Sequence, residues 1–193
     1  MTREFLVSLS LVLLLLPLAG FLVLVFFSRR LPRRGDWLET AFISAAFVLA
    51  AYILWQKLFV FPGETLRLTF TWADFHTVPG IGPLSIVLGF AIDNLSAIML
   101  VVVTLISMLV HVFSIGYMHG DVRYGRYFAF LGIFSFSMLL IVLADNLLLL
   151  YVGWELVGLS SYLLIGHWYE KKSASNAAMK AFITNRIGDV GFF

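Results

Sequence analysis

The sequence contains no cysteine, and only 12% of its 193 residues are charged. The absence of cysteine excludes disulfides, cysteine-ligated zinc, iron–sulfur ligation and thiol catalysis within this chain. The formal net charge is only +2, which argues against a nucleic-acid partner, because nucleic-acid binding requires a concentrated basic face. Neither G-x-x-x-x-G-K-[ST] nor G-x-G-x-x-G occurs, so no nucleotide-binding loop is predicted, and no residue cluster has the spacing of metal ligands.

The sequence is rich in apolar residues. They make up 61% of the chain, and the mean hydropathy is +0.98. A soluble domain averages about 45–50% apolar residues and about 25% charged ones. So much apolar surface cannot be buried inside a small globule, so we expect the chain to be surrounded by lipid.

Six apolar runs are long enough to form membrane-spanning helices, which need about 20 residues each. The first is longer than the apolar region of a signal peptide, about 7–15 residues, and "SRRLPRR" follows it instead of a small-residue cleavage site. The sixth run stops without a cap or a basic flank, so we expect the chain to be the N-terminal part of something longer, either a fragment or a truncated product. The predicted helices are 5–27, 38–61, 92–114, 127–144, 146–166 and one from about 175 onward.

The segment between the second and third runs has a different pattern. In "LRLTFTW" apolar and polar residues alternate with a period of two, "VPGIGP" supplies a turn, and "SIVLGF" follows. This pattern predicts a β-hairpin on the outer surface, with an irregular loop on the membrane interface as the alternative. The predicted fold is therefore an all-α polytopic membrane protein with a small hairpin, in one membrane domain: residues 1–62 form two helices, 63–90 the hairpin and 91–193 the start of a helix bundle.

The basic loops predict how the chain is oriented in the membrane. "SRRLPRR", "GDVRYGR" and "EKK" follow the first, third and fifth runs, so they fall on one side if the helices alternate. Lysine and arginine in short loops favour the cytoplasmic side. We therefore expect the N-terminus on the outer side, together with Arg3, Arg67 and Lys57.

Glu155 lies about halfway along the fifth predicted helix, inside "YVGWELVGLSSYLLIGHW". A carboxylate at the centre of a bilayer costs roughly 2.5–3.5 kcal/mol on insertion scales, so such residues usually face a bundle interior or a water-filled path. Tyr151, Gly158 and Tyr162 share its helix face and leave room for a neighbouring helix or for water. Glu155 is thus a candidate proton-carrying group, and a static ion pair is the alternative.

The sixth helix carries three more candidates. Arg186 and Asp189 lie three residues apart and share a helix face. They can form a structural ion pair; alternatively, Asp189 can take up and release protons, because burial raises the pKa of a carboxyl group. Lys180 lies nearer the predicted cytoplasmic end, where its amino group can also reach the headgroups. A carboxylate at mid-membrane depth beside a helix with these charges predicts proton or cation passage.

Several other polar residues near helix ends have weaker signals. His111 lies near the cytoplasmic end of the third predicted helix; the unperturbed pKa of a histidine, near 6.5, suits a proton relay, and a packing role fits His111 equally. Asp93 and Asp145 stand where predicted helices start, so we expect each to cap a helix N-terminus. His119 and His167 stand at helix ends, where an interfacial position accounts for them.

Two stretches carry a resemblance to a known family: "ADNLLLLYVGWELVGLSSYLLIGHWY" and, after it, "AAMKAFITNRIGDVGFF". With "DNLSAIMLVVVTLISMLVHVFSIGYM", they resemble the N-terminal part of subunit L (chain 5) of bacterial NADH-quinone oxidoreductase, respiratory complex I. The resemblance runs from about Asp93 to the end, and the first 90 residues match only in their layout of two helices and a hairpin.

The resemblance implies an antiporter-like, proton-translocating subunit of the bacterial inner membrane that contacts lipid and other membrane-arm subunits. It places the family's fifth-helix glutamate on Glu155, and its sixth-helix lysine, arginine and aspartate on Lys180, Arg186 and Asp189. It also implies that Glu155 pairs with a lysine of a later helix. NADH, FMN, iron–sulfur clusters and quinone would be bound by other subunits, with no cofactor or redox site here.

Two other functions compete with this interpretation. The A subunit of an Mrp-type Na⁺/H⁺ antiporter shares the helix that contains the Trp-Glu pair. The exact sequences "GWELVGLSSYLLIGHWY" and "NRIGD" resemble subunit L more. A structural membrane subunit that does not pump is the second. It predicts that replacing Glu155 by glutamine leaves transport intact.

Overall fold

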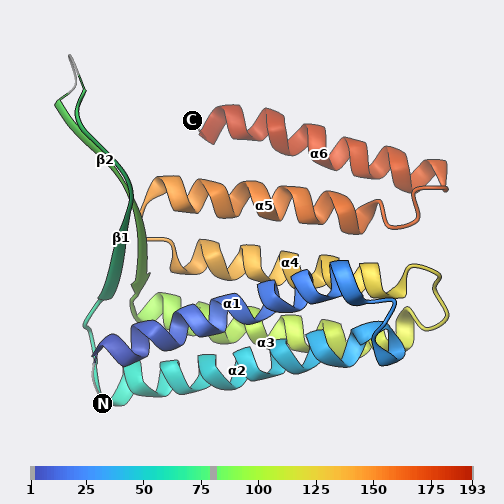
Figure 1. Cartoon of the computed structure of the whole chain (residues 1–193), viewed down its shortest axis with the longest axis horizontal. Coiled ribbons are helices and arrows are strands. Elements are labelled where there is room, and N and C mark those ends of the chain that lie inside the picture. The colour runs from blue at the N-terminus through green and yellow to red at the C-terminus, as the bar shows by residue number, and fades with distance from the viewer. Residues whose placement is uncertain (1–2, 79–81, 193) are drawn as a thin grey trace.

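The structure is a computed structural model, and it describes residues 3–78 and 82–192. Within these described residues it contains six α-helices and one two-stranded hairpin, arranged as a bundle whose helix axes run roughly side by side (Figure 1). The helices are α1 (Arg3–Phe27), α2 (Asp36–Phe59), α3 (Asn94–Tyr117), α4 (Tyr124–Leu143), α5 (Leu147–Ile165) and α6 (Lys172–Phe192). The predicted helices are confirmed, with ends displaced by a few residues.

Five helices, α1 to α5, are long and apolar enough to cross a membrane. At a rise of about 1.5 Å per residue, even the 19 residues of α5 nearly reach the roughly 30 Å of a hydrocarbon core. Large apolar side chains such as Phe26, Val48 and Phe113 stay exposed on the outside of the bundle, as lipid-facing residues do. α6 packs along α5 and carries more polar residues than the other five.

α4 is the most enclosed of the spanning helices and packs against α1, α3 and α5. Its small residues allow this close packing. A Cβ built on Gly125 would lie 2.8 Å from Ser28 Cβ, and one built on Gly153 of α5 would lie 2.8 Å from Ile141 Cγ1 of α4. Small residues at such crossings let helix backbones approach each other in lipid. The main core lies between α1, α2, α3 and α4.

The hairpin pairs β1 (Leu66–Val78) with β2 (Gly82–Ile92), so the predicted hairpin is confirmed and the irregular loop is wrong. The predicted alternation holds only near the bundle: Leu66 is buried, whereas Phe70 and Trp72 are exposed, beside an irregularity in the strand register. At its base, Asn146 Nδ2 donates to the Val87 carbonyl at 2.8 Å. The hairpin is therefore fixed to the connection between α4 and α5.

Three connections lie together at the opposite end of the bundle from the hairpin (Figure 1). They are residues 28–35, which include the short turn η1 (Pro32–Gly35), residues 118–123 and residues 166–171; we call this the loop end. Three consecutive residues of η1 have left-handed backbones, Arg33, Arg34 and Gly35, with φ of 52°, 56° and 83°. This conformation is unfavourable for arginine, so the turn depends on its side-chain contacts.

Candidate functional site

The structure gives Glu155 an arginine as its charged partner. α5 and α6 lie side by side (Figure 1), and Arg186 Nη1 of α6 is in direct contact with Glu155 Oε2. The same Nη1 lies 3.4 Å from Asp189 Oδ2, so one guanidinium serves two carboxylates. We call Glu155, Arg186 and Asp189 the α5–α6 charge cluster. The predicted shared face of Arg186 and Asp189 is confirmed.

Neighbouring side chains hold the cluster in place. Trp154 Nε1 donates to Asp189 Oδ1 at 2.9 Å, which ties α6 to the residue next to Glu155. The guanidinium carbon of Arg186 lies 4.8 Å from the ring centroid of Phe182, a cation–π distance. The side chain of Arg186 is thus oriented by Asp189, which Trp154 holds, and by the ring of Phe182.

The cluster is only partly enclosed. The side chains of Glu155, Arg186 and Asp189 are 21%, 37% and 10% exposed. A cavity of about 700 Å³ touches all three and also reaches Gly158 and Asn185, and a second, of about 330 Å³, reaches Tyr151. A Cβ built on Gly158 would lie 3.5 Å from Asn185 Nδ2, so the glycine keeps space open between the helices. Both cavities are large enough to hold several water molecules.

The charge of the cluster is unbalanced. Two carboxylates and one guanidinium give a net charge of −1 when both acids are ionised. Glu155 Oε1 is buried and has no hydrogen-bond partner. Binding one proton there would neutralise the cluster and let the acid donate a hydrogen bond, and either effect is favourable in a low-dielectric setting. The arrangement can therefore bind and release one proton.

Two predicted site residues lie outside the cluster. Lys180 is exposed on α6 and does not line either cavity. His111 is 1% exposed between α3 and α4, where its Nδ1 lies 2.7 Å from the Ser107 carbonyl oxygen. Its Nε2 is buried and has no hydrogen-bond partner.

Glu39 is a further buried carboxyl group that is not among the predicted site residues; it is 0% exposed on the first turn of α2. Neither of its carboxyl oxygens has a hydrogen-bond partner. It lies against two glycines of other helices: a Cβ built on Gly20 of α1 or on Gly132 of α4 would lie 2.6 or 2.8 Å from Glu39 Cδ. In the sequence, Glu39 stands near a basic turn and so resembles an acidic residue that caps a helix. No local pattern reveals that glycines 19 and 93 residues away enclose it.

The two predicted helix caps have different outcomes. Asp93 caps α3, since its Oδ1 accepts from Ser96 N at 2.7 Å. The prediction for Asp145 is wrong: Asn146 caps α5 instead, because its side chain is the one that reaches Leu149 N. Asp145 pairs loosely with Arg67 of the hairpin, at 3.7 Å.

His119 is exposed at the loop end, as expected. The interfacial position expected for His167 stays a prediction; the residue lies in the connection after α5, where its side chain is only 4% exposed and its Nε2 lies 3.3 Å from Asp121 Oδ1. Burial lowers the pKa of His167 below its usual value, which favours the neutral ring. Burial acts to raise the pKa of Asp121, but hydrogen bonds from Trp168, Arg123 N and His167 together lower it.

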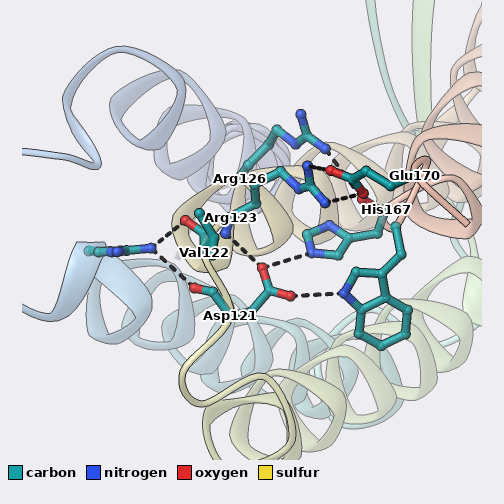
Figure 2. A network of polar contacts seen from close by, with 8 residues as sticks. Asp121, Val122, Arg123, Arg126, His167 and Glu170 are labelled. Atoms are coloured by element: carbon teal, nitrogen blue, oxygen red, sulfur yellow. Dashed lines mark hydrogen bonds and ion pairs between the residues drawn. The ribbon is translucent and has the colours of Figure 1, made fainter.

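Figure 2 shows the polar network that joins the three connections at the loop end. Trp168 Nε1 donates to Asp121 Oδ2 at 2.9 Å, and Arg34 Nη1 donates to the carbonyl oxygens of Asp121 and Val122 at 3.1 and 2.5 Å. Arg123 forms a two-point ion pair with Glu170, and this hydrogen bonding lowers the pKa of the Glu170 carboxyl to about 2. The network links α2, α4 and α6 through their connecting segments.

In the parts of the chain that the structure describes, residues 3–78 and 82–192, no group of three or more His, Asp or Glu side chains is arranged to hold a metal ion. The α5–α6 charge cluster brings three ionisable side chains into contact within the helices. It joins three of the five predicted site residues.

Two protein-family descriptions match the sequence. Residues 78–128 match "NADH-Ubiquinone oxidoreductase (complex I), chain 5 N-terminus", and residues 144–193 match "NADH:quinone oxidoreductase/Mrp antiporter, TM". Together they cover just over half of the chain. The second match contains the whole α5–α6 charge cluster.

Among curated proteins, the chain is 40% identical over 187 residues to NADH-quinone oxidoreductase subunit L of Neisseria meningitidis, covering 96% of this chain and 27% of the relative. It is 44% identical over 179 residues to subunit L of Mycobacterium tuberculosis, covering 93% and 28%. It is also 41% identical over 178 residues to F(420)H(2) dehydrogenase subunit L of Methanosarcina mazei, covering 92% and 25%. The chain therefore spans about a quarter of the length of these relatives, and the similarity extends beyond the motifs that begin at Asp93.

The fold also matches a chain in the solved structure of the membrane-bound sulfane sulfur reductase, an archaeal respiratory membrane complex. The TM-score is 0.73 at 16% identity, and the match covers 93% of this chain and 34% of that chain. This match supports the arrangement of the helices and the hairpin as a known fold.

Proposed function

The chain belongs to the complex I subunit L (chain 5) family of antiporter-like membrane subunits, and we propose that it takes part in proton translocation coupled to quinone reduction. Because the chain spans about a quarter of its relatives' length, the complete cycle requires the longer protein and its complex. Its own contribution is a site that binds one proton inside the membrane.

The single observation that carries this proposal is the net charge of the α5–α6 charge cluster. Two carboxylates share one arginine, and Glu155 Oε1 is buried without a partner. In the proposed cycle Glu155 takes up a proton from water in the adjoining cavities. Arg186 holds Glu155 when it is ionised, and Asp189, anchored by Trp154, keeps Arg186 in reach after Glu155 becomes neutral.

The other predicted residues take outlying positions in this proposal. Lys180 is an exposed cation on α6 whose charge biases the proton affinity of the cluster over a longer distance. His111, between α3 and α4, is a separate relay candidate whose free Nε2 can accept a proton. A basic partner for Glu155 from the rest of the protein would compete with Arg186 and so drive release.

The relatives' names support a role that does not depend on the electron donor. Subunits named for NADH-quinone oxidoreductase and for F(420)H(2) dehydrogenase are 40% and 41% identical to this chain. A region shared between complexes named for different donors fits ion translocation better than donor chemistry. We propose that NADH, FMN, the iron–sulfur clusters and quinone are bound by other subunits, and that the chain itself contains no redox site.

We further propose that the chain resides in the bacterial inner membrane among other membrane-arm subunits. The loop end, which carries Arg29, Arg30, Arg33 and Arg34, faces the cytoplasm. The N-terminus and the hairpin, at the other end of the bundle, then lie outside (Figure 1).

An Mrp-type antiporter subunit is the second candidate, because the match over residues 144–193 is described for both families. The match over residues 78–128, described for complex I chain 5, and the relatives named subunit L favour the first. Sodium dependence separates the two: an Mrp-type subunit requires Na⁺ for proton movement, and a complex I subunit moves protons during quinone reduction.

The test is proton pumping by the complete complex in liposomes. We expect Glu155→Gln to lower the number of protons moved per electron while quinone reduction continues, because glutamine keeps the shape of the side chain but cannot release a proton. Glu155→Asp retains part of the pumping, and Glu64→Gln, at an exposed carboxylate of the hairpin base, leaves it unchanged. A full proton-to-electron ratio in the Glu155→Gln complex contradicts the proposal.

A further inference from the structure

Arginine side chains surround a cavity at the loop end that plays no part in the proposed proton site. The cavity has a volume of about 660 Å³ and lies between the turn after α1, the connection from α3 to α4 and the connection from α5 to α6. Figure 2 shows two of its arginines, Arg123 and Arg126, side by side near Glu170 and His167. The arginines that line it are Arg29, Arg34, Arg123 and Arg126, with Ser28 and Tyr169 between them.

The positive charge of this cavity is not balanced by the chain. Glu170 pairs with Arg123, and it is the only carboxylate within ion-pair distance of these four guanidinium groups among the described residues. Arg34 donates to two carbonyl oxygens, and Arg126 contacts the His167 carbonyl at 3.4 Å; both are neutral acceptors. Four guanidinium groups against one carboxylate leave three positive charges.

Two donors in the cavity are also unsatisfied. Arg123 Nε and Arg126 Nε are both buried from solvent and have no hydrogen-bond acceptor. Because protein atoms enclose both Nε groups, an anion in the cavity would be bound by the other, accessible N–H groups of the arginines. An anion with several oxygens would balance the charge and accept hydrogen bonds from those accessible groups, and phosphate oxygens match the forked geometry of arginine.

The position of the cavity indicates where that phosphate comes from. Phe26 and Phe27, the last residues of α1, are 73% and 49% exposed and directly precede Ser28 at the cavity wall. An apolar surface therefore adjoins a cluster of arginines at the end of a spanning helix. Acyl chains against the phenylalanines and a phosphate among the arginines fit a phospholipid at the membrane surface. The volume also exceeds what a single phosphate ion would fill.

We propose that this cavity binds the phosphate of an anionic phospholipid headgroup, with Arg29 and Arg126 as the principal ligands. Arg34 and Arg123 also donate to protein groups at the loop end, so the bound lipid would brace the three connections that they join. The site is independent of the proposed proton translocation, because none of its residues belongs to the α5–α6 charge cluster.

The test uses the complete complex, with its lipid exchanged in detergent for a phosphatidylglycerol that carries a photoactivatable group on its headgroup. Irradiation and peptide mapping by mass spectrometry locate the attachment. We expect labelling of the segments around Ser28, residues 122–126 and Tyr169. Unlabelled phosphatidylglycerol competes for the site, whereas phosphatidylcholine and inorganic phosphate do not. Competition by inorganic phosphate as strong as by phosphatidylglycerol assigns the cavity to a free anion and overturns the lipid proposal.

Matched arginine variants separate a built site from general surface charge. Arg29→Gln and Arg126→Gln each remove a charged donor to the bound phosphate, so each weakens labelling by about ten-fold. Arg30→Gln removes the same charge from the neighbouring exposed residue, which does not line the cavity, and leaves labelling nearly unchanged. Equal labelling in all three variants, or an equal loss in all three, overturns the proposal.

Discussion

Glu39 and Glu155 are both carboxyl groups inside the helix bundle, but their surroundings are opposite. Glu155 contacts an arginine, adjoins two cavities and is partly exposed. Glu39 is 0% exposed and lies between two glycines, and neither of its oxygens has a hydrogen-bond partner. Under the proposed function, Glu155 rather than Glu39 exchanges the proton, because Glu155 has a charged partner and adjoins cavities that can hold water. Proton exchange by a carboxyl group requires a charged partner whose interaction with the group changes on protonation. It also requires water that carries the proton to the group.

Removing the cation of the α5–α6 charge cluster has the largest expected effect on stability. Arg186→Gln leaves two carboxylates without a counter-charge, so we expect a loss of roughly 3 kcal/mol, the lower end of the range for a broken buried pair, because Arg186 is 37% exposed. Thermal dissociation of the subunit from the complex measures the loss.

The double variant Arg186→Gln, Glu155→Gln is the matched control. It restores the net charge of −1, so it is expected to be more stable than Arg186→Gln alone. If the second substitution destabilises the single variant further, the charge argument is wrong.

The Glu39 side of the comparison depends on space rather than charge. Gly132→Ala introduces a methyl group where the Glu39 carboxyl lies, so we expect a loss of about 1–3 kcal/mol from overpacking. Thermal stability of the complex again provides the measurement. Adding Glu39→Ala creates the missing space and recovers part of the loss. Gly191→Ala, at a position where an added Cβ meets no atom within 4 Å, serves as the control.

The smallest expected effect on stability is at the loop end. The Arg123–Glu170 ion pair holds the pKa of the Glu170 carboxyl at about 2, below the ordinary value of 4.5. A lowered folded-state pKa stabilises the fold above the ordinary value, and this contribution is lost as pH falls from about 4.5 to about 2. Hydrogen exchange at residues 166–171 is expected to rise over that range, and Glu170→Gln removes the dependence. Unchanged pH dependence in the variant assigns it to other groups.

The sequence predicts the helices and the hairpin well because each element has its own local pattern. The apolar runs give the spanning helices, and alternation in "LRLTFTW" gives β1. Arg186 and Asp189 follow from a spacing of three residues. What spacing does not reveal is that Arg186 reaches across to Glu155 of another helix, or that Asn146 rather than Asp145 caps α5.

Glu39 and the arginine cavity are missed for a related reason. The first depends on glycines from α1 and α4, and the second on side chains from three separate connections. Neither environment has a signature in any one segment of the sequence. Both are consequences of how the helices pack.

The central claim is that the α5–α6 charge cluster binds and releases one proton through Glu155. Infrared difference spectra of the complete complex during turnover measure this directly, because a protonated carboxyl has its own absorption band. We predict that turnover changes this band in the native complex and in a Glu39→Gln complex, and that Glu155→Gln removes the change. A difference band that persists unchanged in Glu155→Gln would contradict the claim.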